Sequence, residues 1–145
     1  MRKGMLAALV FVLVACGGDK ANGPQTVTGS YTLRTVNGAN PPGAVYQDTQ
    51  QKLEVTDGSL NLAANNTWTG TLGARFTDFT KTPNEVTNYP NLALDGGTYT
   101  FSGNTLTLQD PTEGLVFTGT VSNGTLTMNV DLIGLGTLTT LVYSK

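Results

Sequence analysis

The sequence contains no histidine and only one cysteine among its 145 residues. The commonest acid–base side chain and the commonest nitrogen ligand for metals are therefore missing. Charged residues make up only 12% of the chain, and eight Lys and Arg face ten Asp and Glu, for a net charge of −2. This composition lacks the basic surface that nucleic-acid binding requires. We expect no metal, no cofactor and no nucleic-acid partner.

The residues that could support catalysis are sparse as well. A serine nucleophile without histidine would need lysine as its base, and the chain has no Ser-x-x-Lys spacing. Asp110 and Glu113 are the candidate carboxylates, but the segment 110–114 has proline and glycine where turns favour them. The segment 95–97, Asp-Gly-Gly, is also interpreted as a turn, and no twelve-residue calcium loop is present. We therefore expect a protein that is not an enzyme.

The N-terminus has the pattern of a secretory signal peptide. Arg2 and Lys3 precede an uncharged, mostly apolar run at 4–14, which is too short to span a bilayer because a spanning helix needs about 20 residues. The run ends in Leu-Val-Ala-Cys at 13–16, which resembles the lipobox of bacterial lipoproteins. The resemblance implies that residues 1–15 are removed and that Cys16 carries a lipid anchor to the membrane. The alternative is an ordinary signal peptide, which would leave an exposed free thiol.

A short polar segment follows the cysteine. Residues 17–26 are small, polar and contain glycine and proline, so 16–26 is predicted to comprise the lipidated cysteine and a flexible tether to a domain at 27–145. In enterobacterial lipoproteins an Asp directly after the cysteine favours the inner membrane. Here Asp19 comes later, so the resemblance implies that the protein is anchored in the bacterial cell envelope, with the outer membrane favoured over the inner membrane.

From residue 27 onward, apolar and polar residues alternate with the period of β-strands. The alternation predicts eight strands at about 28–36, 52–63, 66–77, 97–102, 104–109, 114–122, 125–132 and 136–143. The apolar positions change parity within 52–63. This segment is either one strand with a bulge, in which Gly58 would be the left-handed residue, or a tight hairpin that would raise the number of strands to nine.

Turn residues connect these segments in series. Asn123-Gly124 lies between two alternating segments and predicts a two-residue hairpin, and Gly103-Asn104 lies between two others. Sequential hairpins form an antiparallel meander, and the chain has few charges to protect open sheet edges. We therefore predict an all-β fold in which about eight strands close into a small barrel. A β-sandwich is the alternative.

Several segments resemble a known group of proteins. These are Gly-Ser-Tyr-Thr-Leu-Arg-Thr-Val-Asn-Gly at 29–38, Pro-Pro at 41–42 and Leu-Val-Tyr at 141–143. They are similar to the small lipocalin-like lipoproteins of bacteria, over most of 28–145. The resemblance implies a barrel that binds a small apolar ligand. The sequence departs from lipocalins in having Tyr31 where they begin with Gly-x-Trp, and it shows no late helix.

Aromatic residues and a methionine on the predicted strands are the candidate ligand-binding residues. In a lipocalin-like barrel they would line a cavity for an apolar ligand. Alternatively they fill the barrel as a solid core, and the protein is a structural or protein-interaction module of the envelope. The candidates are Tyr31, Trp68, Phe76, Tyr99, Phe101, Phe117 and Met128.

Two segments lack a clear strand pattern. The longer one, 78–96, is apolar enough to cover a barrel mouth as a lid, or it contains an irregular strand. The other, 37–51, carries Pro41-Pro42 and Tyr46. We expect any binding site at the mouth that these two segments shape.

Overall fold

The computed structural model describes residues 26–145, which form nine antiparallel β-strands. Cys16, the signal peptide and nearly all of the predicted tether lie outside these residues. The strands are β1 (Gly29–Val36), β2 (Gly43–Gln47), β3 (Gln51–Leu62), β4 (Thr67–Asp78), β5 (Glu85–Ser102), β6 (Thr105–Asp110), β7 (Leu115–Ser122), β8 (Thr125–Val130) and β9 (Thr139–Ser144). The part of the chain that the structure describes contains no helix long and apolar enough to span a membrane.

Eight of the strands close into a barrel, as the sequence predicts. From β3 to β9 each strand pairs with the next one along the chain, and β1 pairs with both β9 and β3. The closure brings Tyr31 opposite Leu60 and Leu33 opposite Tyr143. Closure leaves the barrel itself without an open edge and therefore excludes the β-sandwich.

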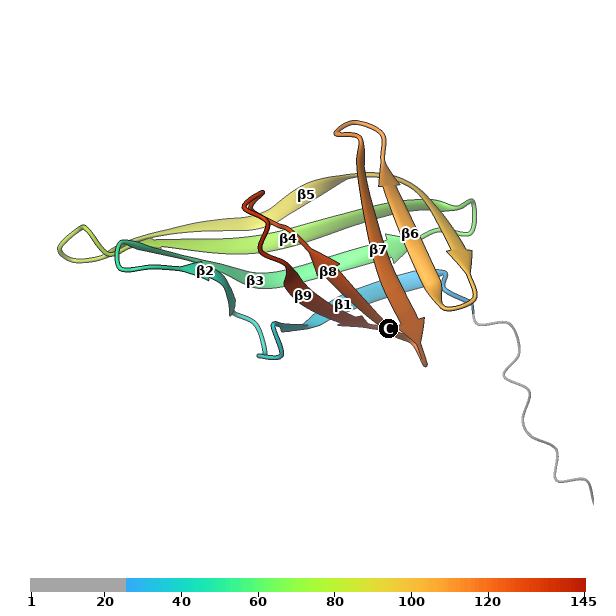
Figure 1. The fold of residues 1–145 in the computed structure, drawn as a ribbon, viewed down its shortest axis with the longest axis horizontal. Helices are drawn as coiled ribbons and strands as arrows, with labels where there is room; N and C mark the ends of the chain where they lie inside the picture. The colour runs from blue at the N-terminus through green and yellow to red at the C-terminus, as the bar shows by residue number, and fades with distance from the viewer. Residues whose placement is uncertain (1–25) are drawn as a thin grey trace, which may run out of the picture.

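β2 stands outside the barrel and corrects the expectation of a loop at 37–51. It pairs with the first half of β3, where Gly43 lies opposite Val55 and Gln47 opposite Lys52. β3, β4 and β5 also continue beyond the short strands β6–β9, and Figure 1 shows them running out together with β2. We call this extension the ribbon; it comprises residues 43–47, 51–55, 74–78 and 85–92.

The parity change in 52–63 comes from a bulge in a single strand, so the two-strand alternative is wrong. Thr56 is the extra residue, because Val55 pairs with Ala74 and Asp57 with Gly73. The prediction that Gly58 is the left-handed residue is also wrong. Gly58 is regular strand, and a Cβ there would meet Leu72 Cδ1 at 3.1 Å. Its small size allows close packing rather than a turn.

The segment 78–96 is mainly strand, so the irregular-strand alternative is confirmed and the lid is wrong. Residues 85–96 belong to β5, which pairs with β4 from Glu85 opposite Asp78 to Thr98 opposite Thr67. The predicted turn at 95–97 is likewise wrong. It is a strand irregularity, in which Leu94 lies opposite Gly70 and Gly97 opposite Trp68, with Gly96 at a φ of 79°.

The hairpin turns and the core follow the predicted pattern. Asn123 and Gly124 have φ values of 50° and 77°, as a tight hairpin turn requires. Alternate side chains of the barrel strands point inward and form one apolar core. Its most buried members include Tyr31, Val36, Leu62, Leu106, Leu108, Val121 and Leu126.

Candidate functional site

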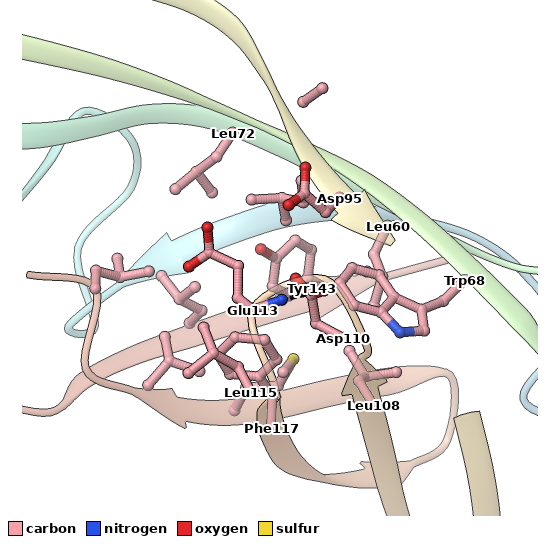
Figure 2. Close-up of a pocket in the computed structure, with 16 residues that line it drawn as sticks. Leu60, Trp68, Leu72, Asp95, Leu108, Asp110, Glu113, Leu115, Phe117 and Tyr143 are labelled. Carbon is pink, nitrogen blue, oxygen red and sulfur yellow. Dashed lines mark hydrogen bonds between the residues drawn. The ribbon is translucent and has the colours of Figure 1, made fainter. Parts of the chain in front are cut away.

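A cavity of about 300 Å³ lies within the barrel (Figure 2). This volume is at the lower end of the range of small-molecule pockets, which is roughly 300–1,000 Å³. Most of its wall is apolar. The lining residues are Leu60, Trp68, Leu72, Ala93, Leu94, Asp95, Leu108, Asp110, Glu113, Leu115, Phe117, Met128, Val130, Leu132, Leu141 and Tyr143.

The wall combines buried and exposed residues, because the cavity reaches the protein surface. Trp68, Leu108 and Leu141 are buried. Leu115 is 45% exposed, and Asp95 and Glu113 are also exposed. A ligand could therefore enter past the exposed residues and contact the buried ones.

Three of the seven predicted binding residues line this cavity: Trp68, Phe117 and Met128. They come from β4, β7 and β8, which the closure of the sheet brings around one space. A residue of another strand holds the Trp68 side chain in place: Trp68 Nε1 donates a hydrogen bond to the carbonyl of Gln109 on β6 at 3.1 Å. That bond fixes the indole ring as part of the wall.

The other four predicted residues lie away from the cavity wall. The Tyr31 hydroxyl donates to the carbonyl of Val27 at 2.8 Å, and the Tyr99 hydroxyl donates to the carbonyl of Ala63 at 2.8 Å. Phe101 packs against the core, opposite Leu106. These three residues fill the barrel as the solid-core interpretation predicts.

Phe76 departs most from its predicted place, because it does not lie in the barrel. It belongs to the ribbon, where it pairs with Leu53 on one side and Thr87 on the other. The sequence pattern of β4 continues without a break from the barrel into the ribbon, so alternation alone could not show that Phe76 has no barrel interior to face.

Only one of the two segments that we expected at the mouth of the site contributes to the cavity wall. Ala93, Leu94 and Asp95 of the segment 78–96 line the cavity, whereas no residue of 37–51 does. Val86, Tyr89 and Leu92 lie along the ribbon instead.

Tyr143 was not among the predicted binding residues, and Asp110 and Glu113 were interpreted only as parts of a turn. Tyr143 alternates with Leu141 on the last strand, so the period of two could have placed it inside. Burial raises its pKa to about 12. Asp110 and Glu113 do belong to a turn, because Asp110 Oδ1 accepts the N–H of Thr112 at 2.8 Å and of Glu113 at 3.2 Å. Both nevertheless line the cavity.

Other polar clusters of the described part serve the fold. In the ribbon, the buried Glu54 pairs with Lys52 Nζ and with Arg75 Nη2, each at 2.7 Å. Burial opposes ionisation of Glu54, but the hydrogen bonds from Lys52 and Arg75 outweigh it and hold its pKa below the usual range. Among residues 26–145, no group of three or more acidic or cysteine side chains is arranged to hold a metal ion.

Comparison of this chain with protein-family models, with curated proteins and with solved structures finds no match.

Proposed function

We propose that this protein is a lipoprotein of the bacterial cell envelope that binds a small apolar ligand in its barrel cavity, without catalysing a reaction. The observation that carries the binding proposal is the cavity of about 300 Å³, lined by Trp68, Phe117, Met128 and a majority of aliphatic side chains. Apolar pockets with a few polar groups are the usual form of small-molecule sites. The eight-stranded closed barrel supports the lipocalin-like interpretation.

The membrane anchor is a separate part of the proposal and rests on the sequence. The Leu-Val-Ala-Cys segment at 13–16 supports lipidation of Cys16, and the absence of an Asp directly after it favours attachment at the outer membrane. The test is Cys16→Ser, which removes the thiol that would accept the lipid. We expect an unprocessed precursor without lipid; normal processing and membrane attachment of the variant would rule the anchor out.

Ligand binding is tested with the chain's single tryptophan, which lies in the cavity wall. The full chain is placed in phosphatidylcholine vesicles, which contain no tryptophan, and titrated with n-octanol. We expect a saturable shift of Trp68 emission to shorter wavelength, because the alcohol replaces water beside the indole. Empty vesicles mixed with free tryptophan provide the blank.

A matched pair of variants distinguishes the cavity from the surface. Val130 lines the cavity and is 6% exposed, so Val130→Phe fills part of the space. Val116 is 61% exposed on β7, so Val116→Phe adds the same group to the surface. We expect the first variant to lose octanol binding at least 10-fold and the second to keep it. Equal responses, or no response in the unchanged protein, would overturn the proposal.

One observation favours a second candidate function, an interaction module of the envelope. The ribbon exposes Val86, Tyr89 and Leu92 at 51%, 45% and 45%, all on the single strand β5, and apolar side chains that gather on a surface can mark a site of protein interaction. If octanol does not bind, a photo-crosslinking residue at position 89 in living cells would test this function. A specific crosslinked envelope protein would support it, and labelling no different from that at position 116 would contradict it.

A further inference from the structure

The polar part of the cavity wall carries charge of one sign. Asp95, Asp110 and Glu113 line the cavity, and neither lysine nor arginine does. Within residues 26–145 both ion pairs involve Glu54 of the ribbon, so neither pair neutralises these carboxyl groups. The cavity therefore presents negative charge to a molecule that enters it.

Two buried polar groups in the wall also have unused hydrogen-bonding capacity. Tyr143 is 3% exposed, and its hydroxyl has no hydrogen-bond partner among the described residues, unlike the hydroxyls of Tyr31 and Tyr99. Asp110 is 7% exposed, and only its Oδ1 accepts bonds from the turn. Neither Tyr143 Oη nor Asp110 Oδ2 is sealed from solvent. These two atoms can therefore form hydrogen bonds with water or with the polar group of a ligand that replaces it.

We propose that the ligand of this cavity is a small cationic amphiphile, a protonated amine on an apolar body. This inference rests on the proposed function and specifies its ligand. At about 30 Å³ for each water-sized group, the cavity holds roughly ten non-hydrogen atoms. The ammonium group donates hydrogen bonds to Asp110 and Glu113, and the apolar body contacts Leu108 and Met128.

The surroundings strengthen this preference. Attraction between opposite charges grows as the effective dielectric constant falls, and apolar residues form most of this wall. The aromatic rings of Trp68, Phe117 and Tyr143 add surfaces that attract cations. Figure 2 shows the carboxyl groups of Asp95, Asp110 and Glu113 among the side chains that surround the cavity. A fatty acid of the same length would bring a second negative charge to these groups and bind more weakly.

The test compares three probes that differ only in the head group: n-octylamine, n-octanol and octanoate. Each is titrated into the full chain in phosphatidylcholine vesicles at pH 7, with Trp68 emission as the readout. We expect octylamine to bind at least 10-fold more tightly than octanol and octanoate to bind most weakly. Added salt should weaken the binding of octylamine and leave that of octanol unchanged.

Variants at the rim show whether the carboxyl groups cause the preference. Asp95 and Glu113 are exposed, and their side chains form no hydrogen bond with the described residues, so Asp95→Asn with Glu113→Gln should leave the fold intact. We expect this double variant to lose 3- to 10-fold more affinity for octylamine than for octanol, and to gain in octanoate affinity relative to octanol. Glu85→Gln, at the far end of the ribbon, is the matched control and should change none of the three.

The outcomes separate this inference from the proposed function. If octanol and octanoate bind as tightly as octylamine, or if the double variant keeps the octylamine preference, the inference is wrong and the cavity remains a binding site. If none of the three probes binds, both the proposed function and the inference fail.

Discussion

The barrel and the ribbon are built from the same strands but are stabilised differently. In the barrel, the alternate residues Leu60 and Leu62 of β3 face other strands across the interior and are 3% and 1% exposed. In the ribbon, β4 and β5 still pair residue by residue, yet Val86 and Tyr89 are about half exposed. Strand pairing needs only the backbone, whereas burial needs a second layer opposite the sheet. Alternation in β4 therefore runs through both regions although only the barrel buries one of its faces, and the ribbon parts of β2 and β5 form strands without a clear alternation.

The ribbon compensates with polar contacts and with protected edges. Glu54 joins Lys52 and Arg75 across its face. On its open β5 edge, Pro90 lacks an N–H group, and Asn91 has a φ of 53°, within the irregular pairing between Leu92 and Tyr89. Proline and bulges on an edge strand discourage pairing with other chains.

The sharpest test of this difference compares one aromatic residue from each region. Trp68→Ala should lower the free energy of unfolding by about 3–5 kcal/mol, because the substitution leaves a large hole in the barrel. Tyr89→Ala in the ribbon should cost less than about 1 kcal/mol, as surface substitutions usually do. Urea denaturation followed by circular dichroism measures both; a loss below about 1 kcal/mol for Trp68→Ala would contradict its place in the core.

A smaller effect is expected where the barrel interior is narrow. A Cβ at Gly119 would meet Leu126 Cδ1 at 2.7 Å and Met128 Cγ at 2.8 Å. Gly119→Ala should therefore cost about 1–3 kcal/mol through overpacking. Thr118→Ala, at the exposed neighbouring position, serves as the control and should stay within about 0.5 kcal/mol. If the two variants are equally stable in urea, the interior at β7 is looser than the structure indicates.

The ribbon's charged cluster predicts a dependence of stability on acid. The pKa of Glu54 is lowered in the folded state, so its stabilising contribution is present above its ordinary pKa of 4.5 and is lost as the pH falls below that value. Glu54→Gln should cost about 1–2 kcal/mol at pH 7, because hydrogen bonds to a charged group are replaced by weaker ones. Unfolding measured from pH 7 to pH 3 should show a shallower decline in this variant than in the unchanged protein and in Glu85→Gln.

The stability of the barrel should instead fall in alkali, because of Tyr143. Burial raises the pKa of Tyr143 from 10 to about 12, so the folded state keeps a proton that the unfolded state loses. The contribution of Tyr143 to stability is complete below pH 10 and is lost as the pH rises through 12. Tyr143→Phe should therefore lose less stability than the unchanged protein between pH 10 and pH 12. Parallel curves for the two proteins would show that Tyr143 is not buried in solution.

The candidate site could be predicted only in part from the sequence. Trp68, Phe117 and Met128 follow from alternation on three strands, because an inward position in any small barrel is either core or cavity wall. Tyr31 and Tyr99 satisfy the same pattern but do not line the cavity, and only the tertiary structure shows which inward side chains face the empty space. Asp110 and Glu113 were predicted to form a turn, and they do. The residues of a turn, however, do not show that the turn will lie beside a cavity in the folded protein.

The sequence by itself determined the all-β class, the positions of most strands, the tight turn at Asn123-Gly124 and the change of parity within 52–63, which left a bulge and a hairpin as alternatives. All of these depend on neighbouring residues, whose period and backbone preferences can be read along the chain. Only the tertiary structure decided that β1 closes on both β3 and β9, that β5 continues into a ribbon, and that Asp95, Asp110 and Glu113 meet at one cavity. These features join residues far apart in the chain, and the shape that brings them together exists only when the whole sheet has closed.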